Sequence, residues 1–207
     1  MVDININILQ LPIEEAKLEL AKLEDCGYLH VILVYPVLQN GEYDFPEMIN
    51  KFNQLKAEAK NINLMLGNLI HYHSSMIHRL QEKQILTLNN SPYILLELPS
   101  DEKPKLLKAA IEFLKDYKII IVQPHKWKYY NYKELVELRE MGVKFLICYS
   151  DTESHKVRKL LKKQMIDFMV AGLSNDMEIS KKADKLIDQE YSQRLVSGSF
   201  QEIIQKY

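Results

Sequence analysis

The chain has 207 residues, of which 47% are hydrophobic and 27% are charged, which suits a single globular domain over residues 1–207 with a sizeable core. The formal net charge of −1 argues against non-specific nucleic-acid binding. The two cysteines, Cys26 and Cys148, argue against a disulfide framework and suit a reducing cytosol.

No apolar run reaches the roughly 18 residues that a membrane-spanning helix needs. The N-terminus also lacks the basic and apolar regions of a signal peptide. We therefore expect no membrane span and a cytoplasmic location. The sequence does not indicate the oligomeric state.

Strands and helices alternate along the chain. Apolar runs predict strands at residues 3–9, 28–35, 63–69, 93–98, 119–122, 144–148 and 168–171. Apolar residues at helical spacing predict helices at residues 13–23, 45–59, 73–81, 104–117, 132–141 and 155–163, and a helical tail at 177–207 with a break near 197–198. This alternation predicts an α/β fold of parallel βα units, in which an open doubly wound sheet and a closed barrel both fit the periodicity.

The most informative stretch is residues 86–104, with the sequence LTLNNSPYILLELPSDEKP. Its strand is apolar on both faces, as in a fully buried strand, and ends in the carboxylate of Glu97. An acid at the carboxyl end of a parallel strand is a usual place for chemistry, and the alternative is that Glu97 pairs with a neighbour. Ser100 and Asp101 are predicted to cap a helix that starts near Pro104.

The same stretch resembles the signature of the bacterial manganese-dependent tyrosine-protein phosphatases of the CpsB/YwqE type, in the polymerase-and-histidinol-phosphatase (PHP) superfamily. The resemblance runs in register over nearly the whole chain. The family's D-I-H-S-H-I-L opening corresponds to residues 3–9, its T-P-H to 35–37, its G-A-E-I to 67–70, its H-P-E-R-Y to 123–127 and its A-S-D-A-H to 171–175. The resemblance implies a distorted seven-stranded (β/α) barrel, which we adopt as the expected fold, and a link to capsule and exopolysaccharide synthesis.

The positions that carry chemistry in this family differ here. The resemblance implies a cluster of three divalent metals held by histidines and carboxylates, which donate electron pairs to such cations. Of that ligand set only Glu97 clearly remains, and Lys126 stands where the family has an arginine that steadies phosphate. Amides or apolar side chains occupy the other positions: Asn5, Asn7, Val37, Leu69, Gln123, Leu173 and Asn175.

Three functional hypotheses follow. The first is a non-catalytic relative with no metal cofactor, which binds a partner on the barrel. The second is a metal-dependent phosphatase with a rebuilt manganese or zinc site from Glu97, His71, His73 and His125. The third is a metal-free enzyme in which Glu97 and His125 act as acid and base.

A cluster of cations and aromatic rings follows the fifth strand. It comprises His125, Lys126, Trp127, Lys128 and Tyr129, which are predicted to bind a phosphotyrosine or a peptide ring. The resemblance implies that this partner is a tyrosine-rich or phosphotyrosine peptide of a bacterial tyrosine kinase. The alternative is that Trp127 and some of the tyrosines pack beneath the loop.

Other residues are assigned structural roles. His30 is expected to be a core histidine with a hydrogen-bonded partner, and Cys148 to pack at the end of a buried strand. The basic helix at 155–163 is expected to present a solvated face. The sequence has no nucleotide-binding glycine motif and no motif for a serine or cysteine nucleophile.

Overall fold

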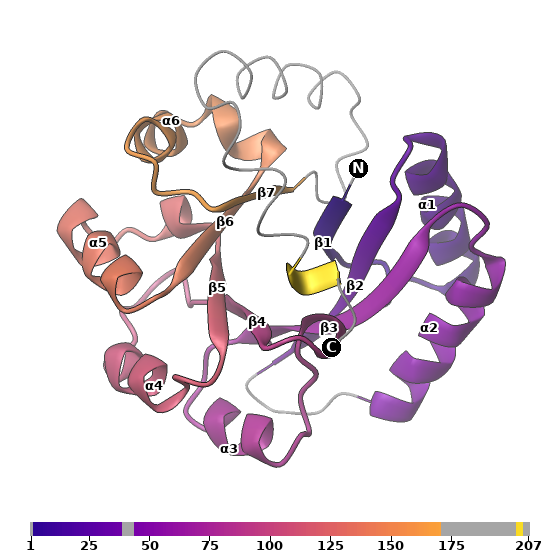
Figure 1. Ribbon diagram of the computed structural model, residues 1–207, viewed down its shortest axis with the longest axis horizontal. Coiled ribbons are helices and arrows are strands. Elements are labelled where there is room, and N and C mark those ends of the chain that lie inside the picture. Colours follow the sequence, from indigo (N-terminus) through magenta and orange to yellow (C-terminus); the bar gives the residue numbers. More distant parts are fainter. Residues whose placement is uncertain (1, 39–43, 171–201, 205–207) are drawn as a thin grey trace.

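Seven parallel strands follow one another around a ring, each hydrogen-bonded to the next along the chain (Figure 1). The computed structural model describes residues 2–38, 44–170 and 202–204. The strands are β1 (Val2–Ile6), β2 (His30–Val37), β3 (Asn63–His71), β4 (Tyr93–Glu97), β5 (Lys118–Val122), β6 (Lys144–Cys148) and β7 (Phe168–Val170). Because β7 lies beside β1, the ring is a nearly closed barrel, which confirms the barrel over the open sheet.

Helices connect the strands and lie on the outside of the ring (Figure 1). The α-helices are α1 (Ile13–Asp25), α2 (Phe45–Glu58), α3 (Met76–Gln81), α4 (Leu107–Phe113), α5 (Tyr132–Glu140) and α6 (His155–Lys162). Short 3₁₀ helices follow or precede strand ends: η1 (Leu88–Asn90), η2 (Pro124–Lys126) and η3 (Tyr149–Glu153). None of the described helices has the length and apolar character needed to cross a membrane.

The alternation of side chains explains why strand β4 is apolar on both faces. Tyr93 and Leu95 point into the barrel, where they belong to the interior cluster. Ile94 and Leu96 point outward and pack beneath the surrounding helices. A strand buried on both faces needs a continuous apolar run. By the same alternation, Glu97 lies on the interior side where the strand ends.

A close contact shapes the barrel wall at Gly67 in β3. A Cβ atom at this position would meet the Leu88 side chain at 2.7 Å and its Cα atom at 3.2 Å. Leu88 is fully buried in the interior cluster. Because Gly67 has no side chain, Leu88 of η1 can pack directly against the backbone of β3.

Residues 202–204 lie across the centre of the ring (Figure 1). Ile203 is 0% exposed and packs in the interior cluster. The Glu202 carboxylate accepts a hydrogen bond from the Tyr93 hydroxyl at 2.5 Å and pairs with Lys118 at 2.7 Å. Tyr93 and Lys118 each begin a strand, so this segment covers the end of the barrel opposite the carboxyl ends of the strands.

The predicted start of the fourth helix is wrong. The helix α4 begins at Leu107, and its N-cap residue Leu106 makes no side-chain hydrogen bond to the helix. The Ser100 hydroxyl donates instead to Asp101 at 2.8 Å. Pro104 disfavours a helical conformation at the preceding residue, so a helix cannot run back from this point toward Ser100.

The predicted core position of His30 is also wrong. His30 is the first residue of β2 and only half-buried, because the strand begins near the surface. Its Nδ1 atom lies 3.3 Å from Asn63 Nδ2, so it does have a hydrogen-bonded partner. Leu173, Asn175 and the predicted helical tail, except residues 202–204, lie outside the described residues.

Candidate functional site

The carboxyl ends of β3 and β4 bring His71 and Glu97 together. The two residues are register partners in the sheet, and His71 Nδ1 lies 3.2 Å from Glu97 Oε2. Their side chains are 36% and 34% exposed. We call this end of the barrel, formed by the carboxyl ends of the strands, the mouth. Glu97 thus lies at the end of the strand, where the sequence predicts it. It also pairs with a neighbouring residue, which was the alternative interpretation of this acid.

Asparagines occupy the mouth at the end of β1. The register between β1 and β2 shifts between Asp3 and Ile6. The Asn5 backbone N–H donates to Asp3 Oδ1 at 2.8 Å. The Asn7 side-chain amide donates to Gln10 Oε1 at 2.9 Å, while Asn7 Oδ1 is buried without a hydrogen-bond partner among the described residues. These amide groups are neutral and bind divalent cations far more weakly than a carboxylate does.

A thiol and an amide form the mouth at β5 and β6. Gln123 follows β5 in the left-handed region, with φ of 52°, and its Nε2 donates to Cys148 Sγ at 3.8 Å. Burial raises the pKa of the Cys148 thiol to about 11, and the charges of Asp151 and Asp3 add to this. The thiol is therefore protonated at neutral pH and is not an activated nucleophile. Its packing against the interior cluster confirms the predicted role.

An acid that the sequence analysis did not single out lies beside His125. His125 Nε2 is 3.5 Å from Asp151 Oδ1, and the two side chains are 8% and 16% exposed. Burial alone would raise the pKa of Asp151, but the hydrogen bond and charge of His125 and the N–H of Cys148 hold this pKa below its usual value. The sequence signal that could have identified Asp151 is its position, three residues past the strand predicted at residues 144–148. His125 thus pairs with Asp151, whereas Glu97 pairs with His71.

Among the described residues, the side chains predicted for a rebuilt metal site lie in separate pairs. Of the four residues predicted for a rebuilt site, His71 and Glu97 are in contact, whereas His125 pairs with Asp151 and His73 bonds to Ser75. In the described part of the chain, no group of three or more His, Cys, Asp or Glu side chains is placed to hold a metal ion. Val37 is buried in the outer core and Leu69 packs against the barrel interior, so neither offers a ligand atom.

The predicted peptide-binding cluster is divided between surface and core. Lys126 and Lys128 are exposed beside the mouth. Trp127 is only 4% exposed and packs in the outer core, so its ring is not available to a peptide; here the packing alternative holds. Tyr129 is half-buried, and its hydroxyl donates to the Pro99 carbonyl. Burial raises the pKa of Tyr129 to about 12, and Asp101 adds to this.

A cleft that the sequence analysis missed lies beside the mouth, between α3 and α4. We call it the α3–α4 cleft; it has a volume of about 640 Å³. Its lining residues are Tyr72, His73, Ser74, Met76, Ile77, Pro99, Glu102, Lys103, Pro104, Lys105, Leu106, Ala109, Ala110 and Phe113. They come from two loops and two helices far apart in the chain, so no local pattern marks them as a unit.

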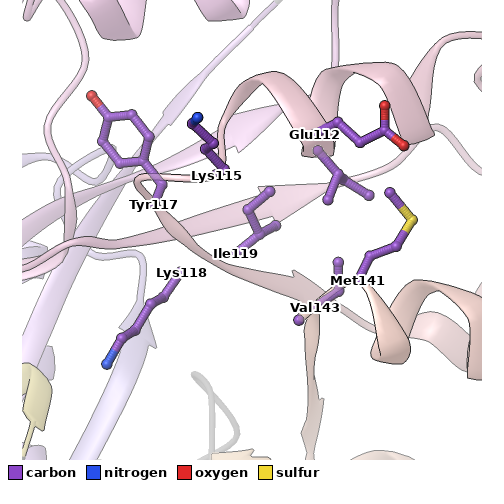
Figure 2. A pocket seen from close by; sticks show the side chains of 9 residues that line it. Glu112, Lys115, Tyr117, Lys118, Ile119, Met141 and Val143 are labelled. Carbon is purple, nitrogen blue, oxygen red and sulfur yellow. The ribbon is translucent and has the colours of Figure 1, made fainter.

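A second cavity lies at the opposite end of the barrel, where β5 and β6 begin. Its volume is about 390 Å³. Its apolar part includes Ile119 and Val143, while the charged ends of Glu112 and Lys118 point away from these side chains (Figure 2). Lys118 is also held by Glu202. This cavity therefore combines an apolar wall with charged side chains at its edge.

Comparisons with known proteins agree with this architecture. A profile of the family described as "Capsular polysaccharide synthesis, CpsB/CapC" matches residues 39–197. Tyrosine-protein phosphatase CpsB from strains of Streptococcus agalactiae, including serotypes V and III, is 30% identical over 131 residues, which cover 58% of this chain and 52% of that protein. This chain thus aligns with about half the length of the curated relatives it matches.

A solved structure has the same fold. It comes from work titled "Crystal structures of YwqE from Bacillus subtilis and CpsB from Streptococcus pneumoniae, unique metal-dependent tyrosine phosphatases". The TM-score is 0.81 at 19% sequence identity, over 94% of this chain and 89% of that chain. The predicted PHP-type barrel is thereby confirmed.

Proposed function

Because this chain belongs to the CpsB/CapC family of capsular polysaccharide synthesis proteins, we propose that it is a non-catalytic member that binds a tyrosine-rich or phosphotyrosine peptide at the mouth of its barrel. The peptide belongs to a bacterial tyrosine kinase of the same cytoplasmic pathway. The related CpsB proteins are named tyrosine-protein phosphatases, so phosphotyrosine recognition is the property carried over, and hydrolysis is the property lost.

The donor set at the mouth is the observation that supports the loss of hydrolysis. A metal-dependent phosphatase needs ligands that fix the ion and lower the pKa of its bound water. Here Asn5, Asn7 and Gln123 contribute neutral amides, and Glu97 pairs with His71 at 3.2 Å. Asp151 likewise pairs with His125 at 3.5 Å. Two carboxylates that already have histidine partners favour separate ion pairs over a multinuclear cluster.

The charge and shape of the mouth support phosphotyrosine binding. Lys126 and Lys128 are exposed and would attract a phosphate as point charges. Tyr129, the next residue along the chain, is half-buried, and its hydroxyl donates to the Pro99 carbonyl. Phosphate recognition here rests on the two lysines, with the Tyr129 ring as an apolar contact.

Binding and hydrolysis are tested together with a phosphotyrosine peptide. We expect calorimetry to show binding without added metal, and phosphate release to stay at background with or without manganese. The double variant Lys126→Ala/Lys128→Ala should weaken binding about tenfold, since each exposed charge contributes up to about 1 kcal/mol. Lys159→Ala, an exposed lysine on α6, is the matched control and should leave the affinity unchanged.

Metal content separates this proposal from the alternative of an active phosphatase. Elemental mass spectrometry on protein purified without affinity histidines should find far less than one equivalent of manganese, zinc or iron after incubation with manganese. A tightly held equivalent, together with phosphate release that Glu97→Ala abolishes, would establish a rebuilt metal-dependent site.

A further inference from the structure

His73 on the floor of the α3–α4 cleft has a buried nitrogen without a partner. The residue is 4% exposed. Its Nδ1 atom lies 2.9 Å from the Ser75 hydroxyl, and its Nε2 atom has no hydrogen-bond partner among the described residues. Buried polar atoms in native proteins nearly always have a partner. This nitrogen therefore marks a place for a hydrogen-bonding atom of a ligand.

The walls of the cleft favour an apolar ring. Most of the lining side chains are apolar or aromatic: Tyr72, Met76, Ile77, Pro99, Pro104, Leu106, Ala109, Ala110 and Phe113. A volume of about 640 Å³ lies in the range of small-ligand sites. An apolar group with a single polar atom would fill such a cleft.

The charges of the cleft lie at its rim. Glu102, Lys103 and Lys105 are exposed, and Lys103 is held by Glu134. Burial lowers the pKa of His73, and the charges of Arg79 and His71 add to this, so the ring is neutral at pH 7. Arg79 does not line the cleft. The lining of the floor thus offers no charge to compensate a phosphate dianion for its lost hydration.

We propose that the α3–α4 cleft binds the phenol side chain of an unphosphorylated tyrosine within a peptide. The ring packs on the apolar walls and the hydroxyl pairs with His73 Nε2. A hydroxyl both donates and accepts, so it suits either tautomer of a neutral imidazole. Solvent does not reach this nitrogen, so the ligand has to part the lining side chains to meet it.

Two features favour a peptide over a free phenol. Leu106 and Phe113 line the cleft and are 67% and 58% exposed, so the apolar surface continues past the space that one ring fills. The cleft also shares its wall with the mouth, because the Tyr72 N–H donates to the Glu97 carbonyl at 2.8 Å. The choice of a tyrosine-rich peptide rests on the proposed function, with a phosphotyrosine at the mouth and an unmodified tyrosine in the cleft.

Peptides that differ at one side chain test the ligand chemistry. Three otherwise identical ten-residue peptides carry tyrosine, phenylalanine or phosphotyrosine, and p-cresol represents a free phenol. Calorimetry on the full chain should show that the tyrosine peptide binds about fivefold more tightly than the phenylalanine peptide, the value of one hydrogen bond. Equal affinity for these two peptides would overturn the proposal, and so would p-cresol binding as tightly as the peptide.

Variants locate the binding. Phe113→Ser and His73→Phe should each weaken binding of the tyrosine peptide at least fivefold. Leu18→Ser, at a 64% exposed leucine on α1, should leave this binding unchanged. Phe113 is exposed, so its variant tests the cleft even where His73→Phe fails to fold. The double variant Lys126→Ala/Lys128→Ala should weaken binding of the phosphotyrosine peptide only. If the double lysine variant binds the phosphotyrosine peptide as tightly as the unchanged protein does, the proposed function is contradicted. If Phe113→Ser leaves the affinity for the tyrosine peptide unchanged, only the proposed binding in the α3–α4 cleft is contradicted.

Discussion

Single residues at the mouth show how far the sequence alone locates side chains in the fold. Glu97 ends β4 on the interior side, as the sequence predicts, and its partner His71 lies opposite it at the end of the neighbouring strand β3. The sequence identifies which side chains reach strand ends, because alternation and strand order fix this. It does not identify pairings such as His125 with Asp151, because these depend on a loop conformation that no periodicity encodes.

The thiol of Cys148 should be unreactive. Its pKa is raised to about 11 from an ordinary 9.0 by burial and by two nearby carboxylates, which lowers the thiolate fraction about a hundredfold at neutral pH. In a Cys26→Ser variant, iodoacetamide at pH 7.5 should therefore label the folded protein far more slowly than the protein in urea. The rate should rise as the pH increases toward 11. Labelling as fast as a free thiol would contradict this placement.

Among the elements, sequence patterns predicted strand β4 correctly but did not predict where helix α4 begins. The strand was predictable because both of its faces are buried, so the whole run is apolar. The start of the helix was not, because the residues that suit an N-cap lie in a loop that Pro104 separates from the helix. The same loop lines the α3–α4 cleft, which was unpredictable because its walls meet only in the folded barrel.

Helix α5 begins with a complete capping box. The Asn131 side chain accepts from the Glu134 N–H at 3.1 Å, and the Glu134 carboxylate accepts from the Asn131 N–H at 2.9 Å. Asn131→Ala should lower the free energy of unfolding by about 0.5–2 kcal/mol, measured by urea denaturation. Asn53→Ala, on the exposed face of α2, serves as the comparison. It should change stability by less than about 0.5 kcal/mol, and an equal loss in both variants would contradict the role of the cap.

At the scale of the whole molecule, the two ends of the barrel differ in their side chains. The carboxyl ends of the strands carry the polar side chains of the mouth. The opposite end is covered by residues 202–204, held by Tyr93 and Lys118. The Asn89 side chain adds a hydrogen bond to the Ile203 carbonyl at 3.0 Å. Such a contact between residues 114 positions apart carries no signal in local sequence patterns.

Truncating Ile203 should destabilise the barrel strongly. The side chain is fully buried in the interior cluster, so Ile203→Ala should lower the free energy of unfolding by about 2–5 kcal/mol. Ile204, which is only half-buried, gives the matched comparison. Ile204→Ala should cost clearly less, as judged from chemical denaturation of both variants. A near-neutral Ile203→Ala would show that this segment does not fill the barrel in solution.

The position of Ile203 in the barrel interior also has a consequence for folding during synthesis. A ribosome makes the strands in their order around the ring, so each new βα unit can dock on the previous one as it emerges. The interior residues Tyr93 and Leu88 nevertheless wait for a partner that is translated more than a hundred residues later. Until then the apolar interior stays open at one end, and such exposed apolar surface makes a folding intermediate prone to aggregate.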